Sequence, residues 1–351
     1  MLGLVRTTLA LMVMVNHLFI GISPLGGYAV FGFFIISGYL MTLIMHESYG
    51  YTWFGRLSFA VNRFLRLFPQ YWASAAISVL LIYFLGSETV VDYHKTMFLP
   101  TTIKEYISNI SLIYPTWFPG DFKPRLVPTT WALTIEIFYY FLICLGLSKN
   151  FNRVKVWFLL SVLYVFASFI PGVPPVNTYP FASGSLPFSI GSAIYFISKN
   201  NEVYQLYLKS KISTRLVFIL MLVNGFIWTA LSKTPIGWIE FGGYLNLLVC
   251  TLLIYGVVKG GKIFQINKPL DNFIGDFSYP VYLLHWQIGL IVSLYMYGEA
   301  FHEYSVRGGI NLMVTLVPVC LLSIIFMFII DKPIQLIRSR IKANKALAKG
   351  L

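Results

Sequence analysis

Long apolar runs that recur along the whole chain constrain its fold more than any other feature. A helix needs ~20 mostly apolar residues to cross the ~30 Å hydrocarbon core of a bilayer. Ten such runs cover residues 4–23, 27–45, 67–86, 129–147, 156–171, 179–197, 215–231, 240–258, 278–297 and 309–330. Only 11% of the 351 residues are charged, too few to cover a water-facing surface. The sequence therefore predicts an all-α, polytopic membrane protein with about ten transmembrane helices.

The placement of the positive charges predicts how these helices are oriented. If the N-terminus lies inside, the outer side keeps only six of the 26 lysines and arginines, namely Lys95, Lys104, Lys123, Arg125, Lys233 and Arg307. The other 20 fall on the inner side, as the positive-inside rule requires. An even number of helices with both termini in the cytoplasm follows. The net charge of +13 is thus a topological signal and does not indicate nucleic-acid binding.

The sequence predicts one transmembrane domain over residues 1–335 and a basic cytoplasmic tail over residues 336–351, with no further C-terminal domain. The first apolar run is too long for a cleavable signal, and an equally long run follows it at once. All three cysteines lie inside apolar runs, so we interpret Cys144, Cys250 and Cys320 as buried small side chains. Neither a disulfide framework nor a metal site is expected.

Ionisable residues inside lipid are costly and usually face a cavity or a partner, so the few present are informative. Arg6 and His17 lie 11 residues apart on the first predicted helix, about three turns and ~16 Å. They therefore point from one face at different depths, with His17 near the outer end. Glu136 is expected at the depth of His17, where a carboxylate could orient an imidazole base. A hydrogen-bonded core histidine and a buried structural carboxylate remain the alternatives.

A cluster of arginines precedes the third apolar run on the predicted inner side. Arg63 and Arg66 share one helical face, and Arg56 lies on it too. An interfacial helix touching anionic lipid explains this pattern. A forked clamp for phosphate groups is the alternative, because arginine binds phosphate through two parallel hydrogen bonds.

Three further residues have both a structural and a functional interpretation. Ser37 and Gly38, in the second run, permit either close helix packing or close approach of a threaded ligand. His285 is expected one to two turns from the inner face, either in a helix-to-helix hydrogen bond or at a ligand site.

Six segments in this order resemble the integral membrane acyltransferase-3 family, which O-acylates bacterial surface polysaccharides and some small molecules. They are Arg6 to His17, Phe33 to Leu40 (FFIISGYL), Phe59 to Pro69 with its RxxR, Trp131 to Tyr140 (WALTIEIFYY), Ser278 to His285 (SYPVYLLH) and Asp331 to Pro333 (DKP). Each motif alone is weak. Together they extend over nearly the whole chain.

The resemblance implies transfer of an acyl group, in most members acetyl, from cytoplasmic acetyl-CoA or another acyl-CoA to a hydroxyl of a cell-surface or exported glycan. Exopolysaccharide, lipopolysaccharide O-antigen and lipid-linked oligosaccharide are acceptors of this kind. His17 would act as the base with Glu136 as its partner. The donor would bind through Arg6, Ser37, Gly38, Arg63, Arg66 and His285.

The resemblance places the protein in the cytoplasmic (inner) membrane of a bacterium, in contact with membrane lipids. A secondary transporter or flippase for a glycan or small molecule is the rival class, because transporters also place histidine, arginine and glutamate near the midplane. Acylation of an amino sugar nitrogen is the nearest alternative among enzymes.

Overall fold

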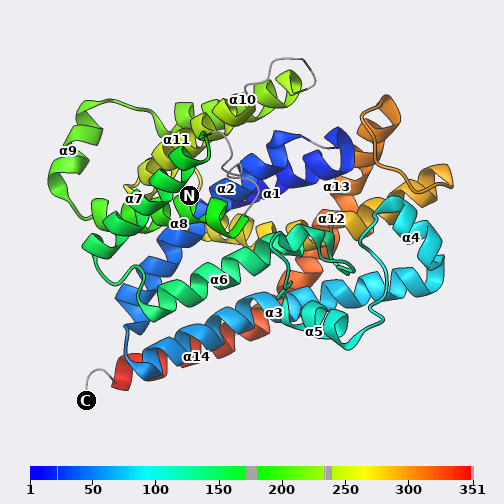
Figure 1. The fold of residues 1–351 in the computed structure, drawn as a ribbon, viewed down its shortest axis with the longest axis horizontal. Helices are drawn as coiled ribbons and strands as arrows, with labels where there is room; N and C mark the ends of the chain where they lie inside the picture. Colours follow the sequence, from blue (N-terminus) through cyan, green and yellow to red (C-terminus); the bar gives the residue numbers. More distant parts are fainter. Residues whose placement is uncertain (22, 171–179, 233, 235–238, 349–351) are drawn as a thin grey trace. The chain divides into compact units, whose positions relative to one another are not determined.

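The computed structural model describes residues 1–21, 23–170, 180–232, 234 and 239–348 (Figure 1). Within these residues the regular secondary structure is helical and contains no strand, as the apolar runs predict. The physical reason is that backbone N–H and C=O groups in lipid must bond to each other, which a helix achieves within one segment. The all-α prediction is confirmed.

Eight helices of the described residues are long and apolar enough to cross a membrane, so the prediction of a polytopic membrane protein is also confirmed. They are Leu2–Ile20, Pro24–Tyr49, Trp53–Leu85, Pro128–Leu145, Thr214–Leu231, Phe241–Val258, Lys268–Tyr297 and Val306–Ile341. A ninth span is counted if Phe181–Ile197 and Asn201–Lys209, bent by 100° at their junction, form one broken span. Residues 22, 171 and 179 of the expected runs lie outside the described residues. The cytoplasmic placement of the termini stays a prediction.

The helices group into two compact units, each built from three stretches of chain. The first unit comprises Met1–Leu9, Ser23–Arg56 and Phe138–Gly275, and the second comprises Ala10–Ile22, Leu57–Ile137 and Asp276–Leu351. Four helices have residues in both units: α1 (Leu2–Val15), α3 (Trp53–Leu85), α6 (Trp131–Leu145) and α12 (Lys268–Tyr297).

The first unit is built around α2 and α8. Besides parts of the four shared helices, it contains α2 (Pro24–Ile44), η2 (Met45–Tyr49), α7 (Phe151–Ala167), α8 (Pro180–Ile197), α9 (Asn201–Lys209), α10 (Thr214–Leu231) and α11 (Ile239–Val258). Glycines allow the two central helices to touch: a Cβ on Gly38 would lie 2.2 Å from the Phe188 carbonyl oxygen, and one on Gly191 would lie 2.0 Å from that of Ile35. Small residues thus serve close helix packing here.

The second unit is built around α3 and α12. Its remaining elements are η1 (Asn16–Ile20), α4 (Ser87–Tyr93), α5 (Ile103–Ser111), η3 (Pro119–Asp121), η4 (Pro128–Thr130), α13 (Val306–Phe326), η6 (Met327–Asp331) and α14 (Lys332–Ala348). The Tyr279 hydroxyl donates to the Leu67 carbonyl at 2.8 Å. The Gln287 amide lies 3.0 Å from the hydroxyls of both Ser74 and Ser78. These buried polar contacts fix the register of α12 on α3.

Two helices begin earlier than the sequence predicts. The third span was expected at residue 67, but α3 begins at Trp53 and contains the arginine cluster. Pro69 removes one backbone donor without ending the helix, which neighbouring groups in a helical bundle can tolerate. α12 likewise begins at Lys268 instead of residue 278. The predicted boundary after residue 335 falls within α14, which runs alongside the N-terminal half of α3 (Figure 1).

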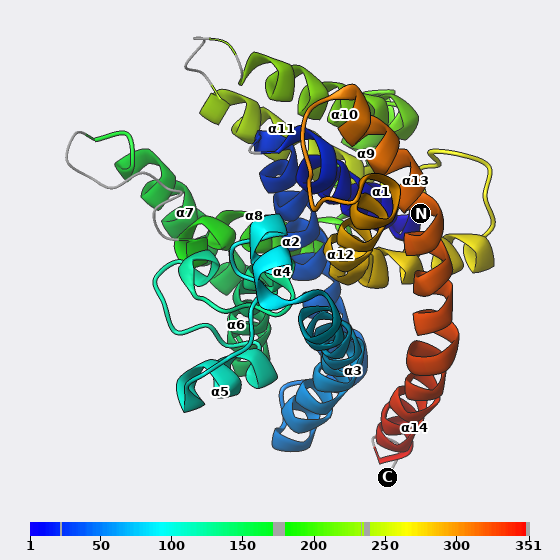
Figure 2. The same ribbon diagram turned by 90° about the vertical axis from the view of Figure 1, so that its right-hand side faces the viewer.

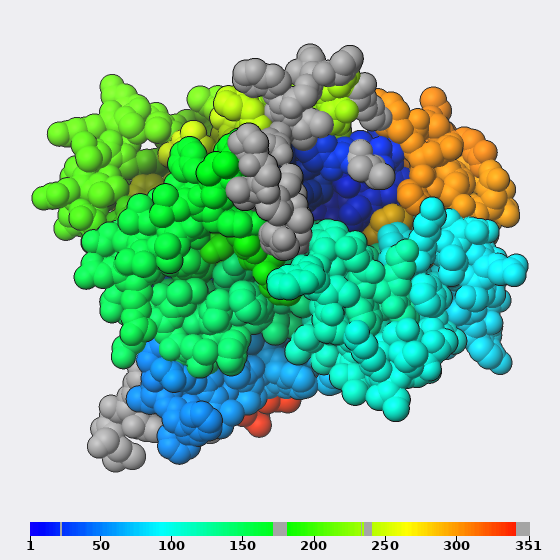
Figure 3. All heavy atoms as spheres, in the orientation of Figure 1, coloured from blue at the N-terminus to red at the C-terminus, as the bar shows by residue number. Residues whose placement is uncertain are grey.

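The long polar connection between α3 and α6 is packed on helices of its own unit (Figure 2). The Tyr71 hydroxyl of α3 donates to the Asn109 carbonyl of α5. Arg125 is buried and donates to the carbonyl groups of four nearby residues, Pro119, Gly120, Phe122 and Pro128. At one end of the second unit the surface of this connection adjoins that of the loop between α12 and α13 (Figure 3). This end of the unit carries the candidate site.

Candidate functional site

A pair of histidines forms the centre of the site. His17 lies in η1, a π-helical segment that continues α1, and such widened turns recur at functional sites. Its Nδ1 is 2.9 Å from Nε2 of His285, and the two rings stack with centroids 5.2 Å apart. The sequence placed His17 near the outer face and His285 near the inner face. Their contact shows that the two residues lie at the same depth, so the predicted difference in depth is wrong. The reason is that α12 starts ten residues earlier than predicted, which puts His285 near the middle of the helix.

The hydrogen bonds of the pair determine which nitrogen carries each hydrogen. His285 Nδ1 lies 3.0 Å from the Val281 carbonyl oxygen, which can only accept, so this nitrogen is the donor. In the neutral ring, His285 Nε2 then carries a lone pair and accepts from His17 Nδ1. Neutral His17 is left with its lone pair on Nε2. The pair therefore presents a base whose tautomer is fixed by its neighbour, as general-base catalysis requires.

The Trp286 indole packs against this pair and also contacts two further histidines. The Trp286 ring stacks on His17 at 5.2 Å. The rings of His94 and His302 meet it edge-on at 4.4 and 5.0 Å. Four of the five histidines of the chain thus surround one tryptophan. All of them belong to the second unit.

His94 and His302 come from segments outside the membrane-spanning helices. Burial, helped by the nearby Arg125 guanidinium, lowers the pKa of His94 to about 3. Burial also lowers the pKa of His302 below its usual value. Both imidazoles are therefore neutral at physiological pH, and each has one defined donor and one defined acceptor nitrogen.

The predicted role of Glu136 as a partner of His17 is not carried by a contact at His17 Nδ1. The partner that the structure gives His17 Nδ1 is His285, so the orienting position predicted for Glu136 is held by an imidazole. Glu136 lies on α6 close enough to the Tyr282 phenol to act on it electrostatically. The Tyr282 hydroxyl donates to the Thr129 carbonyl at 2.7 Å. A catalytic role for Glu136 stays a prediction.

The arginine cluster lies at a junction of three elements in the second unit. Arg66 Nη1 is 3.1 Å from both carboxylate oxygens of Asp331 and 3.9 Å from Asp276. Asp331 also accepts from Gln335 at 2.6 Å. Arg66 thus links α3 to α12 and to the π-helical segment η6. A phosphate bound to Arg66 would share its guanidinium with these two carboxylates.

Arg63 belongs to a neighbouring group on α3 and α14. Its Nη2 donates to the Asn62 side-chain oxygen at 2.7 Å, and Arg338 Nε donates to the same oxygen at 3.2 Å. Two guanidinium groups are therefore brought to one neutral amide. Phosphate binding through Arg63 remains a prediction, and Arg338 joins it as a second cation.

The other predicted donor residues lie in the first unit. Arg6 belongs to its part of α1. The Ser37 hydroxyl is 3.4 Å from the Tyr140 hydroxyl, and both are buried. The side of Gly38 that a Cβ would occupy is filled by the Phe188 backbone. The structure thus gives Gly38 a packing function, and its part in ligand binding stays a prediction.

No sequence pattern singles out His94, Trp286 or His302. His94 and His302 lie in irregular connections, where no periodic pattern marks a buried face. One signal was available, namely that histidine is scarce: the chain has only five, and four of them lie at this site. Among the described residues, no three His, Cys, Asp or Glu side chains are arranged to hold a metal ion. The four histidines surround the indole and do not converge on one point.

Comparison with known proteins agrees with the motifs. Residues 2–332 match a family model described as an acyltransferase domain, of the acyltransferase-3 type. The peptidoglycan O-acetyltransferase OatA of Listeria monocytogenes serovar 1/2a is 24% identical over 314 residues, which cover 81% of this chain and 48% of that protein. The chain thus spans about half the length of the curated relative it matches. No solved structure gives a significant match.

Proposed function

The chain belongs to the integral membrane acyltransferase-3 family, and from that premise we propose that it transfers an acyl group from an acyl-CoA to a hydroxyl of a glycan. The observation that carries the proposal is the His17–His285 pair, which presents a base with a fixed tautomer. The O-acetyltransferase relative supports acetyl as the acyl group and a surface glycan as the acceptor. We place the protein in the cytoplasmic membrane of a bacterium, which is where acyl-CoA and exported glycans meet.

The proposed reaction uses His17 first as a base and then as an acid. Nε2 of His17 takes the proton of the acceptor hydroxyl while the hydroxyl oxygen attacks the thioester carbonyl carbon. A C–O bond forms, the C–S bond breaks, and the proton on His17 passes to the departing sulfur. An ester and a free thiol result, and His17 is neutral again. A positioned base of this kind contributes ~10²–10⁴-fold in rate.

His285 orients the His17 ring during this reaction. Its Nε2 accepts the Nδ1–H of His17, which keeps the His17 lone pair on Nε2 and holds the ring in one plane. Because His285 is itself held by the Val281 carbonyl and is fully buried, it cannot take the other tautomer without losing that bond. His285 is thus a positioning residue in this proposal.

The donor residues extend the proposal to the nucleotide. Arg63 and Arg66 are proposed to attract the phosphate groups of acyl-CoA, with Arg66 also holding α3, α12 and η6 together. For Arg6, Ser37 and Gly38 a role in donor binding is proposed on the family resemblance alone. Substitution at these positions is expected to raise KM for acyl-CoA more than KM for the acceptor.

Glycan analysis in the host tests the proposal directly. The surface glycans of three strains are compared by mass spectrometry: wild type, a deletion, and a deletion complemented with His17→Ala. We expect an acetyl-sized mass increment in the wild type that both altered strains lack. Retention of that increment in the His17→Ala strain, with the variant protein present at normal levels, would rule out His17 as the base.

Turnover by the purified chain separates an enzyme from a transporter or flippase. An acyltransferase releases free coenzyme A from acetyl-CoA in step with ester formation on an added glycan. A transporter or flippase moves its cargo across a proteoliposome membrane without consuming acetyl-CoA. Cargo movement without thiol release would replace the acyltransferase proposal.

A further inference from the structure

Two buried polar groups beside His17 lack hydrogen-bond partners within the part of the chain that the structure describes. They are the Trp286 indole N–H and the Tyr93 hydroxyl. Their side chains are only 4% and 1% exposed, and their rings lie 5.6 Å apart. Buried polar groups in proteins are nearly always hydrogen-bonded, so two adjacent exceptions indicate a missing partner such as a ligand.

His94 adds a donor to this position. Its Nδ1 is 3.3 Å from the Thr96 backbone nitrogen, whose N–H can only donate, so Nδ1 must be the acceptor. The Thr96 hydroxyl lies 3.0 Å from the same nitrogen. The hydrogen of the neutral His94 ring is therefore on Nε2, where it is available to a ligand.

His302 adds an acceptor. Its Nε2 is 3.1 Å from the Tyr93 carbonyl oxygen, which can only accept, so Nε2 carries the hydrogen. The lone pair of neutral His302 is therefore on Nδ1. Tyr93, His94, Trp286 and His302, which we call the indole cluster, thus combine fixed donors with a fixed acceptor.

Three of the four histidines of the site are partly exposed. His285 and Trp286 are buried, whereas His17, His94 and His302 each keep part of their surface accessible. Part of each of these three rings can therefore be contacted from outside the protein. The guanidinium that acts on His94, that of Arg125, is already bonded to backbone carbonyls. These groups suit uncharged hydroxyls, which both donate and accept.

We propose that the indole cluster binds a second hydroxyl group of the acceptor sugar, beside the one that His17 deprotonates. His94 Nε2–H donates to the oxygen of this hydroxyl, and its hydrogen is accepted by His302 Nδ1. The Trp286 indole N–H donates to a further oxygen atom of the same sugar. The acceptor class is thus a neutral sugar with at least two neighbouring hydroxyls. This inference rests on the proposed function and assigns its acceptor subsite.

Isosteric variants separate this role from a merely structural one. In His94→Asn the amide oxygen can keep the bonds to Thr96 while the outward donor is lost. In His302→Gln the amide nitrogen can keep the bond to the Tyr93 carbonyl while the acceptor is lost. The matched controls are His94→Gln and His302→Asn, which keep the outward group and lose the structural bond.

The experiment uses the full-length purified chain with acetyl-CoA and the tetrasaccharide of N-acetylglucosamine as the neutral probe. We expect His94→Asn and His302→Gln each to raise the KM for the tetrasaccharide by roughly 3- to 10-fold, the equivalent of one hydrogen bond. KM for acetyl-CoA is expected to stay unchanged. The control variants are expected to lose thermal stability and to keep a KM for the sugar near that of wild type.

A binding measurement keeps the inference independent of turnover. Calorimetry of the tetrasaccharide with inactive His17→Ala protein, alone and combined with His94→Asn or His302→Gln, is expected to show the same loss of affinity. No binding to His17→Ala, or binding and KM unaffected by both substitutions, would overturn the subsite. Sugar binding weakened by these substitutions without any acetyl-CoA turnover by wild type would instead overturn the proposed function and leave the subsite standing.

Discussion

At the centre of the site a neutral imidazole, and not a carboxylate, accepts the Nδ1–H of the base. A carboxylate would place a charge beside His17 in poorly solvated surroundings, which costs free energy unless it is fully paired. The His285 ring fixes the tautomer of His17 without that charge, because the Val281 carbonyl holds its own hydrogen on Nδ1. Two successive hydrogen bonds therefore determine the tautomer and the orientation of the base.

Substituting His285 tests this arrangement. His285→Ala removes the acceptor of the Nδ1–H, so we expect kcat to fall on the order of 10²-fold through loss of orientation. His285→Gln, whose amide oxygen can accept the same hydrogen, is expected to recover part of that loss. Steady-state kinetics with acetyl-CoA measure both. Equal activity of Ala and Gln variants would show that the hydrogen bond does not orient the base.

The neutral His94 predicts a pH dependence of stability. Its pKa is about 3 in the folded protein, with Arg125, His302 and His285 as its charged or titratable neighbours. In the unfolded chain a histidine titrates near 6.5, so between these values only the unfolded state binds the proton. Stability attributed to His94 is therefore fully present above pH ~6.5 and is lost as the pH falls toward 3.

A matched pair of proteins isolates this contribution. Thermal unfolding of wild type and His94→Asn is followed from pH 7.5 to pH 5. We expect Tm of the wild type to fall more over this interval, since the variant lacks the titrating group and shares the other histidines. If the Tm of both proteins fell equally with pH, His94 would not be held neutral by the folded structure.

At the level of helices, each π-helical segment of the described residues carries a polar side chain with a specific contact. η1 carries His17, η2 carries His46, whose Nε2 is 2.9 Å from the Ser148 carbonyl oxygen, and η6 carries Asp331. A π turn shifts the residues that follow it around the helix axis and so re-aims a side chain without ending the helix. These segments therefore place ionisable groups that a regular helix would point elsewhere.

The Arg66–Asp331 contact provides a test of what holds these helices together. Asp331→Asn leaves the buried guanidinium without its main partner, which typically destabilises a protein by about 3–5 kcal/mol. The matched control is Asp276→Asn, whose carboxylate is 3.9 Å from Arg66 and 31% exposed, with an expected effect of about 0–1 kcal/mol. Thermal unfolding in detergent measures the difference.

The same two variants address donor binding. If Arg66 binds phosphate, freeing it from Asp331 lowers KM for acetyl-CoA in the protein that remains folded. If Arg66 only links α3 to η6, KM stays constant while stability falls. A large loss of stability in Asp276→Asn and none in Asp331→Asn would contradict the assignment of Asp331 as the main partner.

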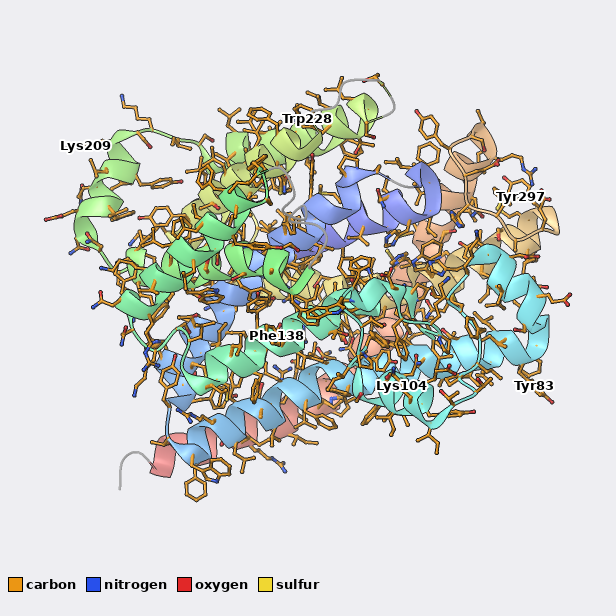
Figure 4. All side chains as sticks on the ribbon, in the orientation of Figure 1. Tyr83, Lys104, Phe138, Lys209, Trp228 and Tyr297 are labelled. Atoms are coloured by element: carbon orange, nitrogen blue, oxygen red, sulfur yellow. The ribbon has the colours of Figure 1, made fainter. Side chains whose placement is uncertain are left out.

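For the molecule as a whole, the positive charges predict a topology that labelling can check. Lys104 on α5 and Lys209 on α9 are both exposed, and Figure 4 labels both side chains. With the native cysteines replaced, Lys104→Cys is expected to react with a membrane-impermeant maleimide in intact cells. Lys209→Cys is expected to react only after permeabilisation. The reverse pattern would place both termini outside.

Local patterns were sufficient to predict several features of this protein. The spacing of apolar runs predicts helices in lipid because each residue's preference for lipid or water is a local property. The motifs likewise identified the family and singled out His17 and His285. Helix lengths were less predictable, because the arginines of α3 and the proline at position 69 do not end a helix that other helices cover.

The pairing of side chains was decided by tertiary packing. His17 and His285 are 268 positions apart, and nothing in a linear pattern says that their rings touch. His94 and His302 enter the site from irregular loops, where no periodicity reports burial. An imidazole bonds to His17 Nδ1 because the length and register of α12 bring His285 to the base. The packing of the helices determines which side chain orients the base. That packing depends on contacts between residues far apart in the chain.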